Sequence, residues 1–116
     1  MLDELMIKLL PTLPRNFVGK VAKRYIAGED RSSAIELASK LMGQGFLATL
    51  DRLGEDVSSQ DQAGKETAAI RDLIEAMALV DIDRNISIKL TQLGLRLDKD
   101  IAFENLLKIL ETASKN

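Results

Sequence analysis

The segment Asn85-Ile-Ser-Ile-Lys-Leu-Thr-Gln-Leu-Gly-Leu95 decides how the whole chain is interpreted. Apolar and polar residues alternate along its first half. The apolar side holds Ile86, Ile88 and Leu90, and the polar side holds Ser87, Lys89 and Thr91. This period of two predicts a β-strand with one apolar face.

Lys89 lies in the middle of the polar face of this predicted strand. Lysine is depleted in strands and is rarely buried without a partner. One interpretation is a strand end, broken at Gly94, that directs an ammonium group toward an anion. The other interpretation is an exposed lysine on the solvated face of a sheet, and the pattern alone leaves both open.

A second alternating segment lies upstream at Phe46–Asp51, with Thr49 and Asp51 on its polar side. Ser58 and Ser59 follow it as N-cap candidates for a long helix that runs to about Val80. The apolar face of that helix holds Ile70, Leu73, Ile74 and Met77. A strand, a long helix and a second strand together predict a parallel pair joined by a right-handed crossover.

Helices are predicted on both sides of this unit. Leu2–Leu10 is expected to form two helical turns, and Pro14–Ala27 is expected to form an amphipathic helix. Ser33 and Glu36 have capping-box spacing at the start of a third helix, which ends at Gly43 or Gly45. The apolar face of the third helix holds Ala34, Ile35, Ala38, Leu41 and Met42.

A final helix is predicted after the second strand, with Asp98 or Asp100 as its N-cap. Its apolar residues recur at helical spacing, so they are expected to face the core. This stripe holds Phe103, Leu106, Leu107, Leu110 and Ala113. The whole pattern predicts an α/β chain in which helices flank two parallel strands.

Composition excludes several classes of function. The chain has 116 residues, 16 of them basic and 18 acidic, and the net charge of -2 gives no field that would attract nucleic acid. It has neither cysteine nor histidine, which removes disulfides, thiolate chemistry and the commonest metal ligand. No apolar run reaches the length of a membrane span, so a cytoplasmic protein is expected. Asp81 and Asp83 are interpreted as solvated loop carboxylates rather than metal ligands.

The segment Asn85–Gly94 resembles the second-strand motif of the flavin-dependent proline dehydrogenases of the bacterial monofunctional type. Gly45-Phe-Leu-Ala-Thr-Leu-Asp-Arg-Leu-Gly-Glu55 is similar to the first-strand motif of the same family. Tyr25-Ile-Ala-Gly-Glu-Asp30 and Ala34-Ile-Glu-Leu-Ala38 also follow its pattern, in order and spacing from about Arg15 to Ala113. These enzymes oxidise L-proline to 1-pyrroline-5-carboxylate, and FAD accepts the hydride.

The resemblance implies a fold and a division of the chain. The family is built on a (β/α)8 barrel, so residues 1–44 are expected to form an N-terminal helical segment. Residues 45–116 are expected to form the first two strand–helix units of the barrel. A barrel of this kind needs roughly 250 residues, so the chain is hypothesised to be an N-terminal fragment.

The resemblance also implies roles for three residues. The family lysine that matches Lys89 holds the proline carboxylate, together with two arginines from the C-terminal part of the barrel. The family glutamate that matches Glu55 pairs with one of those arginines and gates the site. Asp51 is a weaker candidate, expected to contact the residues that bind the substrate rather than the substrate itself. No catalytic, cofactor-binding or metal-binding residue is assigned, and the isolated chain is expected neither to hold FAD tightly nor to oxidise proline.

An alternative function of a different class stays open. A chain with only two strands exposes a strand edge and uncovered apolar helix faces, which favour association with other chains. The alternative is therefore a non-catalytic interaction protein, helical or α/β, that buries these surfaces by self-association.

Overall fold

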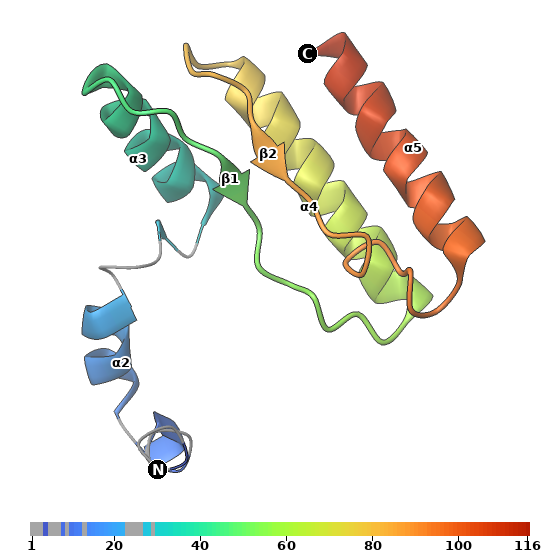
Figure 1. The fold of residues 1–116 in the computed structure, drawn as a ribbon, viewed down its shortest axis with the longest axis horizontal. Coiled ribbons are helices and arrows are strands. Elements are labelled where there is room, and N and C mark those ends of the chain that lie inside the picture. The colour runs from blue at the N-terminus through green and yellow to red at the C-terminus, as the bar shows by residue number, and fades with distance from the viewer. Residues whose placement is uncertain (1–3, 5–7, 9, 13, 23–26, 29) are drawn as a thin grey trace. The chain divides into compact units, whose positions relative to one another are not determined.

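The computed structural model describes residues 4, 8, 10–12, 14–22, 27, 28 and 30–116. The chain divides into two compact units, Met1–Ala34 and Ile35–Asn116. The first unit contains a 3-10 helix at Leu10–Thr12 and helix α2 at Arg15–Ala22 (Figure 1). Most of the helix predicted at residues 2–10, and the end of the one predicted to residue 27, lie outside the described residues. The boundary between these two units lies earlier in the sequence than the division predicted between residues 44 and 45. The predicted division into a helical segment and two strand–helix units stays a prediction.

Helix α3 spans Arg31–Gly43 and begins earlier than the start predicted from a cap at Ser33. The capping-box expectation at Ser33 is wrong, because Asp30 is the residue that caps the helix. Its carboxylate accepts a hydrogen bond from the Ser33 backbone N–H at 2.8 Å and one from the Ser33 hydroxyl at 3.1 Å. A carboxylate accepts such bonds more strongly than a hydroxyl, and its negative charge is favourable at a helix N-terminus.

Of the two stops predicted for α3, at Gly43 and at Gly45, the structure has the one at Gly45. Gly45 has a φ of 88°, in the left-handed region that glycine occupies without strain. The Phe46 N–H donates to the Leu41 carbonyl at 3.1 Å, and the Gly45 N–H donates to the Met42 carbonyl at 2.9 Å. These two bonds form a Schellman motif, which ends the helix and directs the chain toward the sheet.

The two strands pair in parallel, as predicted, but both are short. Strand β1 is Leu50–Asp51 and strand β2 is Ile86–Ser87, with Leu50 opposite Ile86 and Asp51 opposite Ser87. The prediction of a strand from Phe46 was wrong. The segment that carries β2 bends at residues 81–82 and turns at residues 90–97. The other residues of the two alternating segments therefore have no extended neighbour with which to pair.

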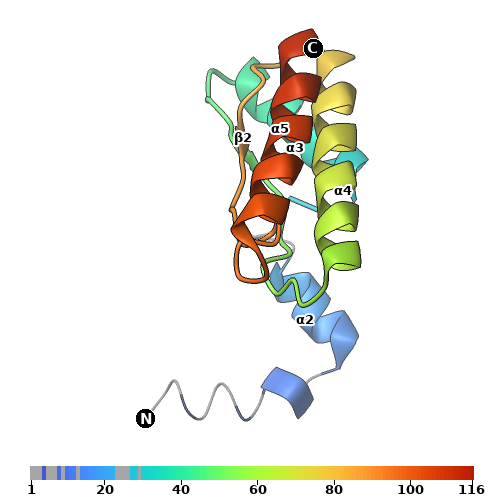
Figure 2. The same ribbon diagram turned by 90° about the vertical axis from the view of Figure 1, so that its right-hand side faces the viewer.

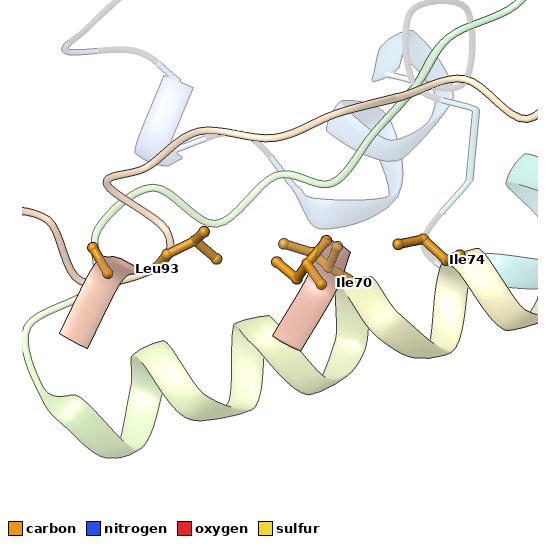
Figure 3. Packing of buried hydrophobic residues seen from close by; sticks show 5 residues of the cluster. Ile70, Ile74 and Leu93 are labelled. Carbon is orange, nitrogen blue, oxygen red and sulfur yellow. The ribbon is translucent and has the colours of Figure 1, made fainter. Parts of the chain in front are cut away.

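Helix α4, at Gln60–Ala78, connects the strands. The prediction of Ser59 as its N-cap is confirmed, since the Ser59 hydroxyl accepts from the Gln62 N–H at 3.2 Å. The predicted apolar face is buried, and Ile70 from this face lies between Leu93 and Ile74 (Figure 3). The core cluster consists of Ile70, Ile74, Leu93, Ala102 and Ile109, with Ile86, Ile88 and Leu106 partly buried against it.

Helix α5 spans Lys99–Lys115 and is capped by Asp98, as predicted. It lies beside α4 (Figure 2). Its predicted apolar stripe is wrong, because Phe103, Leu107 and Leu110 remain 60%, 48% and 53% exposed. Of that stripe, Leu106 packs against the core. The buried face instead holds Ala102, Asn105, Ile109 and Thr112.

The burial of polar residues on α5 has a physical cause. The Asn105 side-chain amide donates to the Leu93 carbonyl at 3.0 Å. The Thr112 hydroxyl accepts from Arg71 at 2.7 Å, so both buried groups have partners. Ala102, which is also buried on this face, has a small side chain. Which residues of α5 are buried therefore depends on their hydrogen-bond partners and their size as well as on their hydrophobicity. None of the helices in the described part of the chain is long and apolar enough to cross a membrane.

Candidate functional site

Three predicted residues meet at the C-terminal ends of the two strands. The Lys89 ammonium nitrogen lies 3.0 Å from an oxygen of Asp51 and 3.0 Å from an oxygen of Glu55. The strand register explains the first contact, because Asp51 lies opposite Ser87 and Lys89 lies two residues further along the same face. We call Asp51, Glu55 and Lys89 the ion triad.

The ion triad is partly open to solvent. The side chains of Lys89, Asp51 and Glu55 are 35%, 39% and 54% exposed. Hydrogen bonding to Glu55 and then to Asp51 raises the pKa of Lys89 above its ordinary value of 10.5. Lys89 therefore stays protonated at neutral pH. The triad contains two carboxylates and one ammonium, and because an ammonium group has three N–H donors, Lys89 keeps one donor for a further anion.

Arg52 and Glu66 support the segment that carries Glu55. The Arg52 guanidinium, on the residue that follows β1, forms two hydrogen bonds to the Glu66 carboxylate of helix α4, at 2.8 and 3.2 Å. This pairing raises the pKa of Arg52. A Cβ atom on Gly54 would lie 2.9 Å from a Glu66 side-chain oxygen, so a side chain there would push the Glu66 carboxylate from its present position. This pair was not predicted, and the position of Arg52 directly after the predicted strand is the sequence signal that could have indicated it.

Gln92 is the other residue whose importance the sequence understated. Its side chain is fully buried, accepts from the Lys89 N–H at 3.2 Å and donates to the Arg52 carbonyl. Gln92 thus contacts the backbone of Lys89 and the backbone of the residue that follows Asp51.

A shallow depression of about 400 Å³ lies beside Glu55. Its lining includes the carboxylates of Glu55, Asp56 and Glu66 and a single lysine, Lys65. A lining with this charge repels the pyrophosphate of a flavin dinucleotide, so these residues do not fit FAD. Within the described residues, no three carboxylates are grouped in a way that would hold a metal ion.

Comparison with known proteins gives one consistent family name. The chain is 37% identical to proline dehydrogenase 2 of Bacillus subtilis strain 168 over 108 residues, which are 92% of this chain and 36% of the relative. It is 34% identical to proline dehydrogenase 1 of Bacillus subtilis subsp. natto over 94 residues, 81% of this chain and 31% of the relative. Identity to a proline dehydrogenase of Deinococcus radiodurans is 31% over 106 residues, 89% of this chain and 34% of the relative.

The chain spans about a third of the length of these curated relatives. No protein-family model matches it. The resemblance predicted from the two strand motifs is confirmed as a resemblance to part of a proline dehydrogenase.

Proposed function

We propose that this chain, which is similar to part of the proline dehydrogenases along 92% of its length, is the N-terminal part of such an enzyme. The enzyme would oxidise L-proline to 1-pyrroline-5-carboxylate in the cytoplasm, with FAD as the hydride acceptor. Its strand–helix units β1–α4 and β2–α5 would be the first two units of a (β/α)8 barrel, preceded by the helical segment 1–44. The parallel pairing of β1 and β2 across a helix supports this placement.

The observation that carries the proposal is the position of Lys89. In a barrel of parallel strands, the active site lies at the C-terminal strand ends. Lys89 follows the C-terminal end of β2 and contacts Asp51 at the end of β1. An ammonium group held there suits the carboxylate of L-proline through a charge-assisted hydrogen bond.

Asp51 and Glu55 would have different tasks in substrate binding. Asp51 is the last residue of β1, so its carboxylate keeps the Lys89 ammonium oriented while the substrate enters. Glu55 lies on the irregular segment between β1 and α4 and is the most exposed member of the ion triad. Its carboxylate would leave Lys89 when proline binds and pair with an arginine from the rest of the enzyme, which would close the site.

The flavin would be held by residues outside this chain. The acidic lining beside Glu55 supports this view, since it disfavours the cofactor's phosphates. The isolated chain should therefore be colourless and inactive. This chain's own contribution would be to bind and orient the proline carboxylate.

The test uses the 116-residue chain and the longest product that its gene encodes, each purified with added FAD. We expect the longer product to show a flavin absorption band and to reduce a dye only when L-proline is present. The 116-residue chain should do neither. A flavin-supplemented longest product that never reduces the dye with L-proline would overturn the proposal.

A second function is favoured by the exposed residues of α5. Phe103, Leu107 and Leu110 form one continuous stripe on the solvent side of the helix, which favours association. The alternative is a non-catalytic protein that self-associates through this stripe. Sedimentation of the wild type and of a variant with serine at all three positions tests it. A monomer at all concentrations would reject this alternative, and a dimer that the variant loses would support it.

A further inference from the structure

Gln92 is a fully buried polar residue, with an exposed fraction of 0%. Burying an amide without partners is costly, so its hydrogen bonds identify what holds it in place. The side-chain oxygen accepts from the Lys89 backbone N–H at 3.2 Å. The side-chain nitrogen donates to the Arg52 backbone carbonyl. The opposite orientation of the amide would place donor against donor and acceptor against acceptor.

These two bonds begin where the sheet ends. The last paired residues of the ladder are Asp51 and Ser87. Arg52 is the next residue after β1, and Lys89 is the second residue after β2. Gln92 therefore joins the two segments of the chain that follow β1 and β2. Its side-chain amide takes the place of the backbone hydrogen bonds that would otherwise continue the sheet.

The backbone of Gln92 completes the arrangement. Its N–H donates to the Lys89 carbonyl at 2.9 Å, so one residue contacts both the N–H and the C=O of Lys89. This is the glutamine half of a capping box, with Lys89 in the N-cap position of the turn that follows. Gly94, with a φ of 100°, ends that turn, and the Asn105 amide anchors it to α5 through the Leu93 carbonyl.

The consequence concerns the Lys89 side chain. A serine or aspartate at the N-cap position would use its own side chain to cap the turn. Lysine does not do so, and its ammonium group instead reaches Asp51 and Glu55. The backbone of Lys89 is thus fixed by Gln92, while its ammonium group pairs with the two carboxylates and keeps one N–H donor for a ligand.

We propose that Gln92 is a positioning residue that sets the Lys89 ammonium against the Asp51 carboxylate by clamping the two strand ends together. Both polar atoms of its side chain bond backbone groups, those of Lys89 and Arg52, so it would act through Lys89. Its relevance to catalysis rests on the proposed function, whereas the clamping itself is a property of the 116-residue chain and is measured without any enzyme assay.

The test compares Gln92→Met with Thr112→Val in the 116-residue chain. Each variant replaces a buried polar side chain with an apolar one of similar size, and each is expected to lower stability. Thr112 is the control because its hydroxyl bonds Arg71 and the Lys108 carbonyl, on the two helices and outside the turn that holds Gln92. NMR titration of the Lys89 side chain gives the pKa of its ammonium group. We expect Gln92→Met to shift that pKa down toward 10.5, and Thr112→Val to leave it as in the wild type. A folded Gln92→Met chain with an unchanged Lys89 pKa would overturn the proposal.

A second measurement needs no variant and applies even if Gln92→Met does not fold. The side-chain amide protons of Gln92 should exchange with solvent far more slowly than those of the exposed Gln60. Equal exchange rates for the two side chains would show that the clamp is open and would overturn the proposal. If the clamp is found but the longest gene product never oxidises proline, the proposed function fails and the positioning of Lys89 stands.

Discussion

The Asp51 carboxylate lies 3.0 Å from the Lys89 ammonium, although 38 positions separate the two residues in the sequence. The parallel register of β1 and β2 brings them together, because it places Asp51 opposite Ser87. Glu55 then approaches the same ammonium from the segment that follows β1. The site thus depends on strand pairing, on the clamp at Gln92 and on the path of residues 52–59.

The first prediction concerns the pH dependence of the ion triad. The pKa of Lys89 is raised in the folded chain, so its charged form stabilises the fold. That contribution is complete below 10.5, the ordinary value, and is lost as the pH rises through the folded pKa. The stability difference between the wild type and Lys89→Met, measured by urea unfolding, should shrink across this window. A constant difference at every pH would contradict this prediction.

The second prediction concerns the cap of α3. Hydrogen bonding from Ser33 lowers the pKa of Asp30 below its ordinary value of 3.8. The stabilisation is therefore present above 3.8 and is lost as the pH falls through the lower, folded pKa. Asp30→Ala should increase hydrogen exchange at the Ser33 amide at neutral pH. Asp30→Asn keeps an acceptor for this amide and serves as the control, so equal exchange in both variants would argue against the cap.

The third prediction separates the two faces of α5. Ile109 is buried in the core, whereas the neighbouring Leu110 is exposed. Ile109→Ala should lower the free energy of unfolding by about 2–5 kcal/mol, because it leaves a cavity. Leu110→Ala should change it by less than about 1 kcal/mol. Denaturant unfolding measures the free energy of unfolding of both variants. An equal loss in the two would contradict this prediction and would favour the apolar stripe predicted from the sequence.

The fourth prediction compares two glycines. Gly94 has a φ of 100°, and a Cβ atom there would lie 3.3 Å from the Ala63 side chain. Gly94→Ala should therefore destabilise the chain by more than about 1 kcal/mol. Gly64 is an open position inside α4, where nothing lies within 4 Å of an added Cβ. Gly64→Ala should stabilise by about 0.5–1 kcal/mol, so the thermal midpoints of the two variants should move in opposite directions.

Local signals in the sequence predicted much of the fold. The caps Ser59 and Asp98 were each one of two predicted candidates, and such candidates can be found because an N-cap depends on residues within one turn. Parallel pairing followed from the order strand, helix, strand. The stripe on α5 was wrong because the burial of Asn105 and Thr112 depends on Leu93 and Arg71, which are distant in the sequence.

The candidate site was predictable to a smaller extent. Alternation placed Asp51 and Lys89 on the polar faces of neighbouring strands, and the structure brings them into contact. The Arg52–Glu66 pair and the clamp at Gln92 were not foreseen, since both depend on the path of the chain after the strands end. The roles in substrate binding and gating rest on resemblance and stay predictions.

The most direct measurement is the KM for L-proline of the longest gene product carrying Lys89→Met. Lys115→Met is the control, because Lys115 also pairs with a carboxylate but lies at the end of α5, away from the ion triad. We predict that Lys89→Met raises the KM roughly tenfold to a hundredfold, as expected for the loss of one charge-assisted hydrogen bond, while Lys115→Met leaves it unchanged. An unchanged KM in Lys89→Met would contradict the assignment of Lys89 as the group that binds the proline carboxylate.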